Sequence, residues 1–109
     1  MLPGFTIASP RHWPEPVEAG EGITAWRIKE ASAADPSVMM VLRFAGGAAF
    51  GEDRHGVREI VHVMEGEFGD GRDVWPAGTV ICGEPGSVHH PQSATGCTLL
   101  VIYPDGEAA

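Results

Sequence analysis

The sequence predicts an all-β domain, folded as a β-sandwich or a small barrel. Fifteen glycines and nine prolines divide the 109 residues into short pieces, and such residues interrupt helices. No stretch keeps apolar residues at helical spacing over several turns. Instead, short runs of β-branched and aromatic residues recur between turn signals, at intervals of about eight to twelve residues. Seven or more short strands are therefore expected.

The first part of the chain differs from the rest. Residues 1–22 are rich in proline, so they are expected to form an irregular arm laid across a single domain at 23–105. The segment 22–30, GITAWRIKE, mixes branched and aromatic residues with charges in rough alternation, which is typical of a half-buried strand. The segment 37–45, SVMMVLRFA, is more continuously apolar, so a strand with both faces covered is expected before Gly46 and Gly47.

The remaining strands are expected between clear turn signals. Residues 59–68, EIVHVMEGEF, form a strand that turns near Gly66 and again at 69–72, where Asp-Gly favours a tight hairpin. Residues 73–91 hold two or three very short strands, separated by Pro-Ala-Gly and Glu-Pro-Gly turns. Residues 96–103, GCTLLVIY, close the domain.

Length and charge narrow the function classes. A chain of this size forms one core and buries roughly 60 to 70% of the surface that its unfolded form exposes. The formal charge of −8 repels phosphate backbones and anionic lipid, so neither nucleic acid nor a membrane is an expected partner. No apolar run is long enough to span a bilayer, and no signal peptide is recognisable, so a cytoplasmic location is expected. Cys82 and Cys97 are expected to be reduced, small core residues.

Potential metal ligands open the strand at residues 53–59. Side chains alternate between the faces of a strand, so Asp53 and His55 share a face, and Glu59 joins them if the intervening turn keeps the same parity. His62 has the opposite parity and is excluded. Downstream, only one of the neighbours His89 and His90 can point inward.

A metal ion needs donors that converge from different strands, because one strand cannot surround it. A barrel brings two such strands together. Two imidazoles with carboxylates suit Zn, Fe(II) or Mn, and two histidines with one carboxylate form the set used by many oxygenases. The pattern predicts a site for one divalent metal.

The spacing of these residues resembles the two sequence boxes of the cupins. Gly47 is followed by five residues, then Asp53-Arg54-His55, three residues, Glu59, six residues and Gly66. Later, Gly78 is followed by five residues, Glu84-Pro85-Gly86, two residues and His89. The phrases LRFAGGAAF, VMEGEF, WPAGTVI, PGSVHHP and GCTLLVIY, between about Trp13 and Tyr103, are similar to those of ChrR-like cupins, the type found in anti-sigma factors and small dioxygenases.

The resemblance implies a small RmlC-like jelly-roll cupin that binds a divalent metal through His55, Glu59 and His89. Asp53 stands where the family has its first histidine, and Glu84 where it has a proline. Asp53 could bind the ion directly, bind it through a water, or not bind it. Without an ion, Asp53 and Glu59 would repel each other, so at least one of their pKa values is expected to rise.

Three functions are compatible with this resemblance. The first is a metal-dependent oxygenase that acts on a small diketone or phenolic substrate. The second is a non-catalytic cupin that senses a ligand or a redox change, and the third is a degenerate cupin without metal. A homodimer is expected in each case, because exposed edge strands need a cover.

The other conspicuous side chains are expected to have structural roles. His62, His90, Arg54 and Arg58 are expected at the surface or at a subunit contact, and His12 lies in the arm. The larger apolar residues are expected in the core, where those facing inward could line a pocket; they are Trp26, Trp75, Met39, Met40, Phe44 and Phe50.

Overall fold

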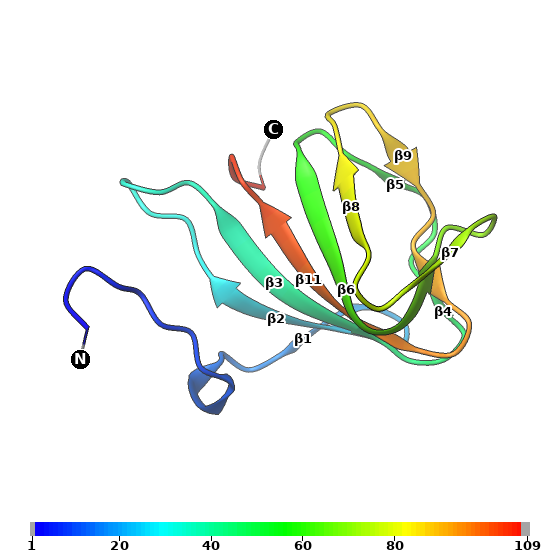
Figure 1. Ribbon diagram of the computed structural model, residues 1–109, viewed down its shortest axis with the longest axis horizontal. Helices are drawn as coiled ribbons and strands as arrows, with labels where there is room; N and C mark the ends of the chain where they lie inside the picture. The colour runs from blue at the N-terminus through cyan, green and yellow to red at the C-terminus, as the bar shows by residue number, and fades with distance from the viewer. Residues whose placement is uncertain (1, 108–109) are drawn as a thin grey trace.

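The computed structural model describes residues 2–107 and is built almost entirely of β-strands (Figure 1). The all-β prediction is confirmed. One 3-10 helix, Pro10–His12, precedes the strands. The strands are β1 (Val17–Gly20), β2 (Ile23–Lys29), β3 (Val38–Phe44), β4 (Ala48–Ala49), β5 (Asp53–Arg54), β6 (Glu59–Gly69), β7 (Val74–Pro76), β8 (Val80–Gly83), β9 (Val88–His89), β10 (Gln92–Ser93) and β11 (Cys97–Tyr103).

All the strand pairs are antiparallel, and the longest strand joins two parts of the barrel. The main sheet runs in the order β1-β2-β3-β11-β6-β10-β4, and β7 and β8 also pair with β6. The first part of β6 pairs with β11 and β8, whereas its last residues pair with β7 and β10. Between them β6 bends at a bulge opposite Thr98 and Leu99, as bulged strands do. A separate ribbon of β5 and β9 lies beside β8 and β7 (Figure 1).

The core lies inside this curved sheet. Along β11 the inward residues Cys97, Leu99 and Val101 are buried, as the alternation of a strand requires. Phe44 and Phe68 meet edge to face with ring centroids 6.0 Å apart, which is a favoured aromatic geometry. Residues from strands distant in sequence therefore share one apolar centre.

The outer face of β3 is covered in part by the N-terminal segment. Val41 is 5% exposed and is in register with Trp26 on β2. The Trp13 ring packs on the Trp26 ring at a centroid distance of 6.2 Å. The arm therefore packs on the barrel near Trp13, whereas residues 2–8 are exposed and extend away from the sheet (Figure 1). The outer face of β3 is covered only in part, because Arg43 is exposed.

The arm is not irregular throughout. Residues 17–20 form β1, which pairs with β2, so the prediction of an irregular segment 1–22 is wrong for these residues. The physical reason is that Pro16 is the last proline of the segment. From Val17 onward each backbone N–H can donate to a neighbouring strand.

Two further expectations need correction. Cys97 is buried, but Cys82 is exposed on β8, so it is not a core residue. Phe50 is 46% exposed rather than buried. Strands β4 and β10 were not expected, because two-residue strands are too short to show a period.

No helix within residues 2–107 is long and apolar enough to cross a bilayer.

Substitution of Gly66 is expected to break the fold at the bend of β6. Gly66 has φ +75, and a Cβ there would collide with the carbonyl oxygen of Gly96 and lie 2.9 Å from the Cα of Cys97. Gly66→Ala should therefore lower the free energy of unfolding by about 3 kcal/mol or more, through strain and overpacking. Denaturant unfolding measures the loss.

Gly47→Ala is the matched control for this substitution. Gly47 has a similar φ of +85, but a Cβ there would have no neighbour within 4 Å. Its replacement should cost about 1 kcal/mol, from backbone strain alone. Equal losses for the two variants would show that the close approach of Gly66 to Gly96 does not constrain the fold.

Candidate metal centre

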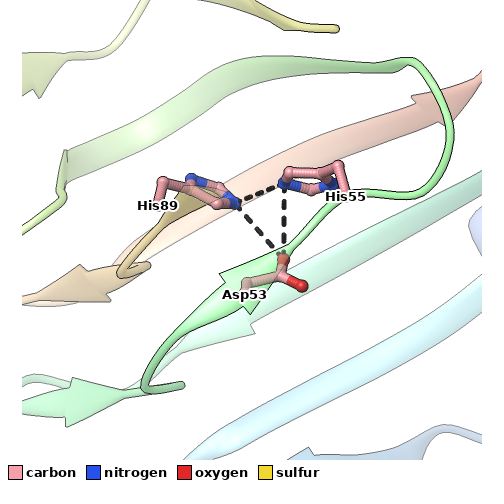
Figure 2. Close-up of side chains that lie close together, drawn as sticks. All are labelled: Asp53, His55 and His89. Carbon is pink, nitrogen blue, oxygen red and sulfur yellow. Dashed lines mark hydrogen bonds and ion pairs between the residues drawn. The ribbon is translucent and has the colours of Figure 1, made fainter. Parts of the chain in front are cut away.

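Three backbone segments bring the predicted donors together. Asp53 on β5 is paired with His89 on β9, His55 follows β5 directly, and Glu59 is the first residue of β6. Figure 2 shows the side chains of Asp53, His55 and His89 directed toward one another. The two sequence segments therefore converge, as the spacing predicts.

Backbone hydrogen bonds fix this convergence. The N–H of His55 donates to the carbonyl of Ser87 (2.9 Å), and the N–H of Gly86 donates to the carbonyl of His55 (2.7 Å). The N–H of Ser87 in turn donates to Glu84 (3.0 Å), which closes a turn with Gly86 at φ +90. The Glu-Pro-Gly turn thus holds His89 opposite Asp53.

The donor atoms of the four residues lie close together. His55 Nε2 is 2.7 Å from His89 Nε2 and 3.3 Å from Glu59 Oε1. Asp53 Oδ2 is 3.2 Å from His89 Nε2 and 3.5 Å from His55 Nε2. His89 Nε2 is 3.9 Å from Glu59 Oε1. The two imidazoles lie between the two carboxylates.

This arrangement fits a divalent ion. Nitrogen and oxygen donors bind such ions at about 2.0 to 2.2 Å, which places neighbouring donors roughly 3 to 3.6 Å apart. The five distances given above span 2.7 to 3.9 Å, so the two imidazoles together with either carboxylate lie near the spacing of ligands. Two neutral imidazoles and two carboxylates would also balance the charge of the ion. Among the described residues, Asp53, His55 and His89 form a group of possible ligands whose donor atoms all lie within 4.8 Å of one another.

Burial raises the pKa of Glu59. Its side chain is 7% exposed and that of His55 is 6% exposed, compared with 32% for Asp53. Loss of water around the carboxylate is the main cause, and attraction to His55 and hydrogen bonding by Tyr103 oppose it. Repulsion by Asp53 adds to the rise but is a smaller effect. The predicted rise in a carboxyl pKa is confirmed, although burial is its main cause.

Tyr103 belongs to the site, although it was not among the predicted site residues. It ends β11 and has the inward parity of Leu99 and Val101. Burial and the nearby Glu59 carboxylate raise the pKa of its hydroxyl, so the phenol stays protonated and can donate a hydrogen bond. The alternation of GCTLLVIY indicates that Tyr103 faces inward, but nothing in the sequence pairs Tyr103 with Glu59.

The other histidines and arginines lie outside the cluster. His62 on β6 is in register with Leu100 and Val80, on the face opposite Glu59. The exposed His90 lies 3.9 Å from Glu52. Arg54 and Arg58 are largely exposed and face Glu52 and Asp105 respectively. These positions agree with the roles expected for them.

The cluster borders an apolar cavity of about 190 Å³ inside the barrel. Asp53, Glu59, His89 and Tyr103 provide its polar surface. The rest of the lining is apolar and consists of Ala19, Ala25, Met40, Leu42, Phe44, Phe50, Val61, Phe68, Pro91, Leu99 and Val101. Such a pocket, mostly apolar with a few convergent polar groups, is typical of a small-molecule site.

Comparison with known proteins identifies the type of domain. A family model described as the ChrR cupin-like domain matches residues 8–104. No curated protein matches the sequence.

Solved structures show the same fold at low sequence identity. An RmlC-like cupin from Shewanella frigidimarina is 23% identical, with 93% of this chain and 90% of that chain covered and a TM-score of 0.76. ChrR of Rhodobacter sphaeroides, in complex with SigE, is 22% identical over 84% of this chain and 47% of that chain, with a TM-score of 0.68. The hydroxypropylphosphonic acid epoxidase of S. wedmorenis is 19% identical, with 92% of this chain and 59% of that chain covered and a TM-score of 0.74.

Glu59→Gln is expected to stabilise the metal-free protein at neutral pH. Because the folded-state pKa of Glu59 is raised, the stability that comes from its protonated form is complete below its ordinary pKa. That stability is lost as the pH rises through the raised value. Between pH 4.5 and 8 in a chelator, the wild type should therefore lose more stability than Glu59→Gln, measured by denaturant unfolding. Parallel losses in the two proteins would contradict the cost assigned to this buried carboxylate.

Proposed function

The chain belongs to the ChrR cupin-like family, and from that premise we propose that it is a metal-dependent oxygenase for small diketone or phenolic substrates. The observation that carries the proposal is the convergence of four donor side chains, of which Asp53, Glu59 and His89 lie on the wall of an apolar cavity. The donors supply an ion site, and the cavity supplies a place for an organic molecule beside it.

Asp53, His55, Glu59 and His89 would hold the ion. The two imidazoles and two carboxylates suit Fe(II), Mn or Zn. Asp53 replaces the family's histidine, and its oxygen lies as near to both imidazoles as a ligand would. We therefore propose Asp53 as a direct ligand.

The cavity volume limits the size of the substrate. A cavity of about 150 Å³ lined by Leu, Ile and Phe accommodates benzene. The 190 Å³ here would hold one substituted ring or a short diketone, but not a fused ring system. Phe44, Phe68 and Leu99 would contact the apolar part, which leaves the oxygen atoms of the substrate toward the polar side.

The residues around the substrate have distinct roles in this proposal. A divalent ion supplies Lewis acidity or reactivity toward dioxygen. Once Glu59 binds the ion, the Tyr103 hydroxyl would be free to donate its one hydrogen bond to a substrate oxygen. The apolar walls exclude water, which strengthens that hydrogen bond and the attraction between opposite charges.

The second candidate is a sensor without turnover. It is favoured by the match to ChrR, which was solved in complex with the sigma factor SigE. This chain spans about half the length of that protein, so a sigma-factor partner is not carried over. A degenerate, metal-free cupin is the third candidate, because Asp53 departs from the family pattern.

We also propose a homodimer. Strands β1 and β4 end the main sheet, and each has a single strand partner within residues 2–107. Such edges usually pair or are covered. The arm carries exposed Leu2, Phe5 and Ile7, which a second copy could bury.

Metal content separates the third candidate from the first two. Protein purified without added metal should contain about one divalent ion per chain, measured by elemental analysis. His55→Ala and His89→Ala should each lower the affinity by more than about 100-fold, since even residues that only orient ligands contribute 10- to 100-fold. His62→Ala, on the opposite face of β6, is the control and should retain the ion. Metal binding that survives both alanine variants would contradict the site.

Oxygen consumption separates the enzyme from the sensor. With iron bound, a five-carbon 1,3-diketone or a single-ring phenol should stimulate oxygen uptake, and a bicyclic analogue should not, because it exceeds the cavity. Tyr103→Phe should reduce the rate by about 10-fold or more through loss of one preorganised donor. Tight ligand binding without oxygen uptake would instead support the sensor.

A further inference from the structure

We propose that the gap between β8 and β9 is the route by which the divalent ion reaches and leaves the four donors, separate from the cavity that holds the organic substrate. This inference rests on the proposed metal site. It concerns which part of the chain admits the ion, a question that neither the family nor the fold answers.

The barrel wall is open between these two strands. In the described structure β8 is hydrogen-bonded to β6 alone, and β9 is hydrogen-bonded to β5 alone. The two strands follow each other through the turn at 84–87, and Figure 1 shows them side by side. No ladder of backbone hydrogen bonds therefore closes this side of the site.

A second cavity of about 210 Å³ fills the gap. His55, Glu59 and His89 line it, whereas Asp53, Glu59 and His89 line the barrel cavity. The donor cluster thus lies between two cavities and can be reached from both.

Gly83 keeps the second cavity open near the imidazoles. It is the last residue of β8 and is in register with Glu59. A Cβ at this position would lie 3.2 Å from Ser87 Oγ and 3.9 Å from His55 Cδ2. Its φ is not positive, so an L-residue is compatible with the backbone and would narrow the opening, with a shift of a few tenths of an ångström by the Ser87 hydroxyl.

Each cavity presents two carboxylates, Asp53 and Glu59 in the barrel cavity and Asp70 and Glu59 in the second. Only the second has a carboxylate, that of Asp70, which is not itself a proposed ligand and could attract a cation before it binds. Asp70 lines the second cavity, and its Oδ1 accepts hydrogen bonds from the backbone N–H groups of Arg72 and Asp73, which favour its charged form. A hydrated cation would be attracted by Asp70 and then by Glu59. In the barrel cavity it would have to lose water against apolar walls, which is costly.

Transfer of the bound metal to an excess of chelator tests the route. Gly83→Val should slow metal release and uptake at least about fivefold while the dissociation constant stays within about twofold. Val88→Ala, which removes a half-exposed side chain from the wall, should accelerate both rates. Asp70→Asn should slow metal uptake about threefold at low salt and less at high salt. The substitution removes the electrostatic attraction between residue 70 and the approaching cation, and salt screens such attraction.

Phe50→Ala is the matched control, because Phe50 lies at the exposed edge of the barrel cavity. It should leave both rates unchanged. Faster exchange in Phe50→Ala, with no effect of Gly83→Val, would overturn the proposed route and assign entry to the barrel cavity. If wild-type protein bound no metal at equilibrium, the metal site itself would be wrong. Denaturant unfolding of each variant verifies that it is folded, which matters most for Gly83→Val.

Discussion

The backbone pairing of residues 53–55 with residues 86–89 is the constraint on which the site depends. Two hydrogen bonds between His55 and the turn at 84–87, and the register of Asp53 with His89, fix the donors before any ion is present. Gly86, at φ +90, permits the turn that makes this pairing possible. Because the positions are fixed by backbone, an aspartate in place of a histidine at residue 53 would change the type of donor and leave the architecture in place.

The site stores an unfavourable interaction within a stable barrel. Glu59 is buried beside apolar strands, and its carboxylate loses most of its water. The protein tolerates this cost because Phe68, Val61, Leu99 and their neighbours bury a large apolar area around it. Binding a cation would relieve part of the cost, which links the function of the site to the stability of the domain.

Two openings onto one cluster give the proposed enzyme separate paths for unlike molecules. Transfer of an apolar substrate from water to the barrel cavity is favourable. A cation is instead stabilised by water and by nearby carboxylates. The incomplete pairing of β8 and β9 therefore has a function in this view. The same gap would be a weakness in a barrel with a purely structural role.

The sequence by itself determined the all-β class, the main strands and the four candidate donors. Alternation at Asp53 and His55, the spacing to Glu59 and the turn before His89 all depend on local chain geometry, which a sequence records directly. It did not predict β1 or the two-residue strands β4 and β10, because such short pairings form only where a partner edge is available. Nor did it place Cys82 outside the core.

The tertiary structure alone decided how near the donors lie to one another, that Tyr103 interacts with Glu59, and that a gap opens beside Gly83. These are contacts between residues far apart in the chain. They depend on how the whole sheet curves, which no local pattern specifies.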